Sequence, residues 1–197
     1  MNNRIKILTT SLLIIVCLFS VGCQKKITLS DEYNYDNISQ YVELANYKEI
    51  LKSTKDKDTA FQQIIDKSEI MAYPEKEYQE RYDAIIDNYI KNDPSGDSDL
   101  EIVLNKATGL DYNTSIKYIK QDIWSEMKED LVVRAMAEQE GIELTNEEYT
   151  AYIEKYMAQN GITYENATER LQMPLEDFIK QQRLENQYIF ETIQNQL

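Results

Sequence analysis

Glycine and proline stand almost only where helices would begin or end, and this placement limits the fold more than any other feature of the sequence. The positions beyond residue 22 are Gly96, Gly109, Gly141, Gly161, Pro74, Pro94 and Pro174. Proline fits the first turn of a helix, and glycine fits the position just after the last turn. The stretches between them are free of helix breakers. We therefore predict an all-α chain.

Apolar residues recur at helical spacing between these positions. Helices are expected over 59–71, 74–91, 98–107, 113–140 and 146–158, with a final helix opening at Pro174 after a short segment at 164–171. One face of the second helix carries Tyr78, Tyr82, Ile85, Ile86 and Tyr89. The long helix carries a stripe of Ile116, Ile119, Ile123, Met127 and Leu131, with Trp124 beside it. Thr145 and Glu148 have the spacing of a capping box that starts a helix.

One stretch departs from the helical pattern. Residues 41–51 alternate weakly between apolar and polar side chains, which indicates a short strand or an extended segment near the N-terminal side of the fold. We therefore allow one short N-terminal strand in the all-α prediction.

The N-terminal segment has the layout of an export signal. Arg4 and Lys6 precede an apolar run from Ile7 to Gly22, and Cys23 follows. The run is shorter than the roughly 20 apolar residues that a spanning helix needs. This segment resembles a bacterial lipoprotein signal, although Ser20 stands where such signals prefer Leu. The resemblance implies cleavage before Cys23 and attachment of acyl chains such as palmitate to that residue. The alternative is an uncleaved anchor with an incidental cysteine.

These features predict three regions and a location. Residues 1–22 would be the signal peptide, 23–40 a polar tether, and 41–197 one folded domain on the extracytoplasmic face of a bacterial cell membrane. Loss of the signal would change the net charge from −14 to −16. Nucleic acid is not an expected partner, because phosphate contacts need basic patches.

Residue types that serve catalysis and metal binding are scarce. The chain has no histidine, and its cysteines are Cys17, in the signal, and Cys23, at the lipid attachment site. Histidine-dependent triads and the common zinc sites are therefore excluded. Residues 92–99 do not fit a calcium-binding loop of the EF-hand type. In such a loop glycine stands at the sixth position, and with Gly96 there the first and twelfth positions, which need ligands, would be Lys91 and Ile102. We predict no enzyme activity, no metal and no cofactor.

Residues 132–161, VVRAMAEQEGIELTNEEYTAYIEKYMAQNG, resemble the C-terminal helical domain of trigger factor and its SurA-type chaperone relatives. The shared pattern is Val-Val with Ala135 and Ala137, then Glu140-Gly141-Ile142, then Thr145 before an amphipathic helix. The resemblance implies an irregular helical cradle that holds unfolded polypeptides without nucleotide. The prolyl isomerase domain of these relatives is not expected, because only the glycine-free residues 52–73 separate the strand from the helix at Pro74.

Tyrosine and methionine suit a surface that binds varied apolar segments and stays soluble. We take Tyr78, Tyr82, Tyr152 and Tyr156 as candidate peptide-binding residues. Each also fits a half-buried core position, and this alternative stays open.

Two functions follow from the sequence. The first is a lipid-anchored extracytoplasmic chaperone that binds unfolded or newly exported polypeptides. The second is a structural or assembly lipoprotein that binds one dedicated folded partner. The sequence predicts neither the client nor the oligomeric state.

Overall fold

The computed structural model describes residues 37–143 and 145–197, and the predicted signal, Cys23 and most of the predicted tether lie outside these ranges. The described part is built from helices with one two-stranded sheet, which confirms the all-α prediction with its short strand. None of its helices is long and apolar enough to cross a membrane. The helices are α1 (Tyr47–Ser53), α2 (Lys57–Lys67), α3 (Glu75–Lys91), α4 (Leu100–Thr108), α5 (Tyr112–Glu140), α6 (Asn146–Gln159), α7 (Ala167–Leu171), α8 (Leu175–Gln181) and α9 (Leu184–Gln196).

The N-terminal layer combines the sheet with two helices. Strand β1 (Val42–Glu43) pairs antiparallel with β2 (Glu69–Ile70), with Val42 opposite Ile70. The expected extended stretch 41–51 is therefore only partly extended. Its second half is helix α1, because the Asn46 side chain accepts the backbone N–H of Glu49 and starts a helical turn.

Two expected boundaries also move in this layer. The helix expected over 59–71 ends at Lys67, since the Ser68 hydroxyl donates to the Ile64 carbonyl and accepts the Ala45 N–H, which turns the chain into β2. The packed part begins before residue 41. The 3-10 helix η2 (Ile38–Gln40) buries Ile38 in the core, within the stretch expected as tether.

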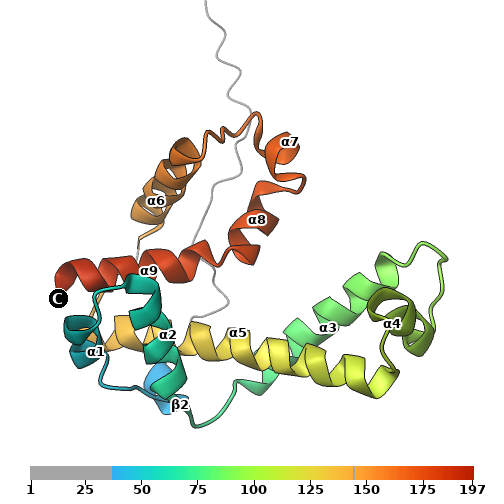
Figure 1. The fold of residues 1–197 in the computed structure, drawn as a ribbon, viewed down its shortest axis with the longest axis horizontal. Coiled ribbons are helices and arrows are strands. Elements are labelled where there is room, and N and C mark those ends of the chain that lie inside the picture. Colours follow the sequence, from blue (N-terminus) through green and yellow to red (C-terminus); the bar gives the residue numbers. More distant parts are fainter. Residues whose placement is uncertain (1–36, 144) are drawn as a thin grey trace, which may run out of the picture.

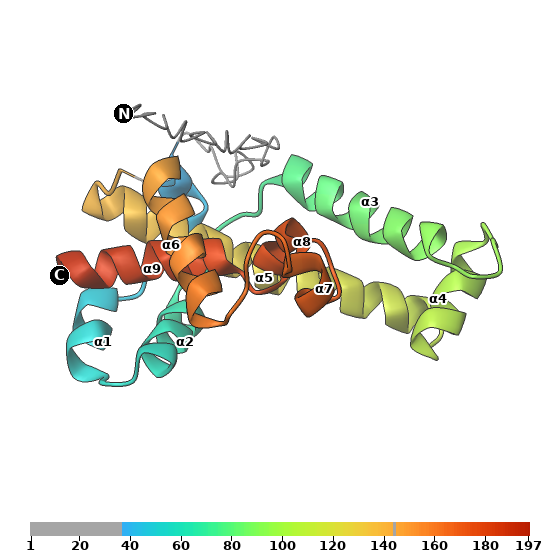
Figure 2. The same ribbon diagram turned by 90° about the horizontal axis from the view of Figure 1, so that it is seen from above.

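Helices α3 and α4 and the first half of α5 form an arm that extends away from the rest of the molecule (Figure 2). The arm has its own apolar cluster, with Leu104, Ile119, Ile123 and Met127 buried at its centre. The predicted stripe on the long helix supplies three of these four residues. Tyrosines and isoleucines of α3 cover the cluster from the other side.

The second half of α5 belongs to a larger core. Val132, Val133 and Met136 are fully buried there, against α9, the N-terminal layer and α6. Helices α6, α7 and α8 form an arch that leaves α5 and returns to α9 (Figure 1). The long helix thus joins two separate apolar clusters end to end.

Glycine stands at the C-terminal ends of α4, α5 and α6 as predicted, and two of these ends form the same turn. Gly141 and Gly161 both have positive φ, and the residue after each donates to a carbonyl five residues back: Ile142 to Ala137 at 3.0 Å, and Ile162 to Met157 at 2.8 Å. This is the hydrogen-bond pattern of a glycine-terminated helix followed by an apolar residue. Ile162 is buried, so the turn also anchors the start of the arch.

The single final helix expected from Pro174 is wrong, because the chain breaks into α8 and α9. Arg183 lies between them with φ 50° and ψ 40°, a left-handed conformation that no glycine supplies. Its guanidinium donates to Glu129 and Asp130 of α5. These ionic contacts hold the backbone in a conformation that costs about 1 kcal/mol or more for a residue other than glycine.

Candidate functional site

The four predicted tyrosines lie in two different places. Tyr78 and Tyr82 are on α3, in the arm, and Tyr152 and Tyr156 are on α6, in the arch. All four are partly buried. The structure therefore separates the four candidate peptide-binding tyrosines into two groups, one in the arm and one in the arch.

The α3 pair belongs to a row of four aromatic rings, here called the aromatic row: Tyr73, Trp124, Tyr78 and Tyr82, in that spatial order. The centroid of the Trp124 ring lies 6.4 Å from that of Tyr73 and 6.0 Å from that of Tyr78. Tyr78 and Tyr82 are 6.4 Å apart. The angles between neighbouring ring planes are 20–25°. The rings therefore form a regular stack that links α5 to α3.

Three separate segments supply the row. Tyr73 precedes the Pro74 that opens α3, Tyr78 and Tyr82 are one turn apart on α3, and Trp124 is on α5. The Tyr73 hydroxyl donates to the Trp124 backbone carbonyl at 3.4 Å. The three tyrosine rings pack on the buried residues of the arm cluster. Because the cluster fixes one side of the tyrosine rings, the row is held in place by the core of the arm.

The three tyrosines of the row are partly buried. This burial raises the pKa of the hydroxyls of Tyr73, Tyr78 and Tyr82, since the charged phenolate is disfavoured away from water. Trp124, in contrast, is 43% exposed. An apolar ring of this size left in solvent, beside three tyrosines, is a surface suited to apolar or cationic side chains of a ligand.

Two members of the row, Tyr73 and Trp124, were not among the predicted site residues. Trp124 follows the stripe residue Ile123, so the helical pattern placed it at the edge of the buried face. The sequence does not show how α3 packs against α5, so the exposure of the Trp124 ring could not be predicted from it. Tyr73 lies just outside a helix, where helical periodicity gives no signal.

The α6 pair is covered by neighbouring helices. The ring of Tyr152 lies 5.5 Å from that of Tyr188 on α9, and the ring of Tyr156 lies 6.2 Å from that of Phe178 on α8. Burial raises the pKa of Tyr152 above its ordinary value, and the nearby Glu191 carboxylate adds to the shift. These tyrosines join the arch to the core, which is the half-buried core role that the sequence left open.

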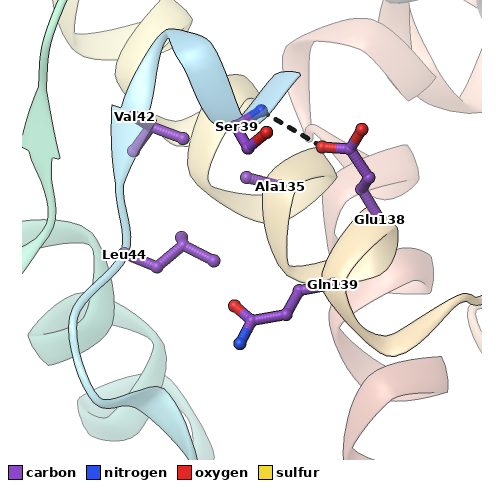
Figure 3. Close-up of a pocket in the computed structure, with 6 residues that line it drawn as sticks. All are labelled: Ser39, Val42, Leu44, Ala135, Glu138 and Gln139. Atoms are coloured by element: carbon purple, nitrogen blue, oxygen red, sulfur yellow. Dashed lines mark hydrogen bonds between the residues drawn. The ribbon is translucent and has the colours of Figure 1, made fainter. Parts of the chain in front are cut away.

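An open hollow of about 360 Å³ lies between the N-terminal layer and the end of α5 (Figure 3). Its lining residues are Ser39, Val42, Leu44, Ala135, Glu138 and Gln139. Glu138 already accepts the Ser39 backbone N–H at 3.1 Å, as the dashed line in Figure 3 marks. The hollow offers the three polar side chains of Ser39, Glu138 and Gln139 and no converging set of catalytic groups.

Charged side chains gather where α3, α5 and α9 meet, and we call this group the ionic junction. Asp130, only 3% exposed, accepts from Arg81 at 2.7 Å, from Asn186 at 2.7 Å and from Arg183. Arg183 also donates to Glu129 at 2.7 Å. The junction lies between the two apolar clusters of α5 and satisfies its own charges, so we assign it a structural role. Across residues 37–143 and 145–197, no three acidic or cysteine side chains are grouped to hold a metal ion.

Comparison of the chain with protein-family models, with curated proteins and with solved structures finds no match.

Proposed function

We propose that this protein is a membrane-anchored, extracytoplasmic chaperone that binds unfolded or newly exported polypeptides without ATP. The anchor is the acylated Cys23, and the signal-like segment before it is what supports this part of the proposal. The likeness of residues 132–161 to trigger factor and SurA-type helical domains supports the chaperone role.

The aromatic row is the observation that carries the proposal. A holdase must offer apolar contacts to many sequences and remain soluble by itself. Rings that are fixed on one side by a core and open on the other meet this need, because rigid aromatic side chains lose little conformational entropy on binding. We place client binding at Tyr73, Tyr78, Tyr82 and Trp124, and we leave Tyr152 and Tyr156 to the packing of the arch.

The test is suppression of aggregation measured by light scattering. A chain starting at Gln24 retains every described element and is mixed with a chemically unfolded client diluted into buffer without ATP. We expect suppression near stoichiometric ratios. The double substitution Tyr78→Ala and Tyr82→Ala should reduce it, and circular dichroism should show that the helices are retained.

Tyr118→Ala is the matched control. Tyr118 lies on α5 within the arm but outside the row, and its side chain is 53% exposed. It should suppress aggregation as well as the unchanged chain. If a folded chain gives no suppression and a mild pulldown returns one stoichiometric partner, the dedicated-partner alternative replaces this proposal.

A further inference from the structure

We infer that α7 and α8 form a lid over the inner face of the arch and that Arg183 holds this lid closed. The lid is residues 167–181, and the inner face is where Tyr156 of α6 meets Phe178 of α8. Opening of the lid requires no client, so it stands apart from the proposed function. Three properties of the lid support it: shallow burial, the backbone at its two ends, and the contacts of Arg183.

The lid is packed less deeply than the helices beside it. Between residues 167 and 181, the structure buries Ala167 and Ile179 and leaves the other side chains exposed or half-buried. Its helices have five and seven residues, and neither has a side-chain hydrogen bond at its N-cap. Helices this short are marginal by themselves, and segments with few buried contacts open more easily than the whole fold. By contrast, α6 has a capped N-terminus and three buried residues, Tyr149, Ile153 and Met157.

A residue with positive φ stands at each end of the lid. Gly161, before α7, has a φ of 64°, and Arg183, after α8, has a φ of 50°. Hinges in proteins are commonly a few residues at the ends of helices that absorb large changes in φ and ψ. Rotations at Gly161 and Arg183 would thus move α7 and α8 together and leave α6 and α9 in place.

An arginine restrains each of these hinges. At the first hinge, Nη1 of the exposed Arg170 donates to the Gly161 carbonyl at 2.8 Å. At the second, Arg183 donates to Glu129 at 2.7 Å and to the nearly buried Asp130. The second restraint is the stronger, because hydrogen bonds between opposite charges are stronger still away from water. Its loss would free the backbone of Arg183 from a left-handed conformation that is otherwise disfavoured.

Opening of the lid would uncover an apolar surface. In the arch, α7 and α8 stand opposite α6 (Figure 1). The ring centroids of Tyr156 and Phe178 are 6.2 Å apart, and both rings are half-buried against the larger core. Leu175 and Ile179, on the same helix as Phe178, also pack on this core. Movement of α8 away from α6 would separate the two rings, so the lid controls access to this aromatic pair.

The experiment is hydrogen–deuterium exchange followed by mass spectrometry, on the full chain in nonionic detergent. Two variants loosen the lid at different places. Arg183→Gln removes the ionic contacts at the hinge, and Phe178→Ala removes the ring that meets Tyr156. Ile64→Val is the matched control, because it weakens the larger core at a fully buried position on α2, outside the lid.

In the unchanged chain, we expect the backbone amides of α7 and α8 to exchange at least about tenfold faster than those at the centres of α6 and α9. Arg183→Gln and Phe178→Ala should each accelerate exchange in the lid by about tenfold, as expected for the loss of one good contact. Ile64→Val should accelerate exchange at the centres of α6 and α9 and leave the lid unchanged, since a local opening does not depend on the stability of the whole fold.

Arg183→Lys tests the hinge with less risk to folding. It keeps a positive charge in the ionic junction but loses the forked guanidinium. Exchange in the lid should therefore rise by about threefold, between the unchanged chain and Arg183→Gln.

Exchange in the lid that is as slow as at the centres of α6 and α9 of the unchanged chain would overturn the inference. So would equal acceleration of the lid and of these centres by Ile64→Val, because the lid would then open only with the whole fold. If neither substitution at Arg183 accelerates exchange in the lid, Arg183 does not hold it closed. If Phe178→Ala leaves the lid unchanged, the contact with Tyr156 is not what the lid covers.

Discussion

Arg81 on α3 donates a 2.7 Å hydrogen bond to Asp130 on α5, and the second oxygen of the same carboxylate accepts from Arg183 at the start of α9. One nearly buried acid thus ties three helices together at the point where the arm meets the main core. A buried charge that is fully paired is tolerated, but removing one partner leaves the others buried and uncompensated.

We therefore predict that Asp130→Ala destabilises the fold by about 3 kcal/mol or more, because two arginines lose their shared partner. The measurement is urea unfolding followed by circular dichroism. Asp122→Ala, which removes an exposed acid from the same helix, should change the free energy of unfolding by less than about 0.5 kcal/mol. Equal effects of the two substitutions would show that the ionic junction does not stabilise the domain.

Substitution by glycine should have opposite effects on stability at two residues with positive φ, Gln172 and Arg183. Gln172 follows α7 with φ 57° and is exposed, so Gln172→Gly should relieve backbone strain and stabilise the fold by up to about 1 kcal/mol. Arg183→Gly relieves a similar strain but removes the guanidinium that pairs with Glu129 and Asp130. We expect it to destabilise the fold. Thermal unfolding of the two variants checks both signs, and stabilisation by Arg183→Gly would contradict the role given to its ionic contacts.

The sequence predicted most of the helices because their ends carry local signals. Gly109, Gly141 and Gly161 end or follow helices as expected, and Thr145 caps α6 by accepting the Glu148 N–H at 3.2 Å. The break at Arg183 has no such signal. Its cause is Asp130, 53 residues earlier in the chain, and such a contact cannot be read from local sequence.

The candidate site was predictable only in part, for the same reason. The helical spacing of Tyr78 and Tyr82 put them on one face, but their neighbour Trp124 comes from another helix. The equally regular spacing of Tyr152 and Tyr156 gave no indication that α8 and α9 cover that face. A periodic pattern identifies the apolar side of a helix, and only the tertiary structure decides how much of it stays open.

The contact between α1 and the end of α5 should make stability depend on pH. The Lys48 ammonium lies 3.0 Å from Oε2 of Glu140, and the Tyr47 hydroxyl donates to the other oxygen. These hydrogen bonds hold the pKa of Glu140 below its ordinary 4.5. A carboxylate with a lowered pKa in the folded state stabilises the fold above its ordinary pKa, and this contribution is lost as the pH falls through the lowered value.

We therefore expect Glu140→Gln to lower the free energy of unfolding more at pH 7 than at pH 3. Urea titrations of both chains at the two pH values make the comparison. Glu143→Gln, at an exposed position just beyond α5, is the control and should show no such difference. The prediction would be contradicted if Glu140→Gln lowered the free energy of unfolding by the same amount at both pH values.

Substitutions at the two groups of tyrosines should separate packing from binding. Tyr152 contacts Tyr188, which itself lies 5.4 Å from the fully buried Tyr149, so Tyr152 supports a continuous cluster between α6 and α9. Removing its ring should cost about 2–3 kcal/mol, somewhat less than for a fully buried aromatic residue. Tyr152→Phe keeps the ring and should cost much less. Urea unfolding measures both, and under conditions where Tyr152→Ala remains folded it should suppress client aggregation as well as the unchanged chain. A stable Tyr152→Ala variant with weakened suppression of aggregation would instead place the arch in the binding surface and give Tyr152 the peptide-binding role predicted from the sequence.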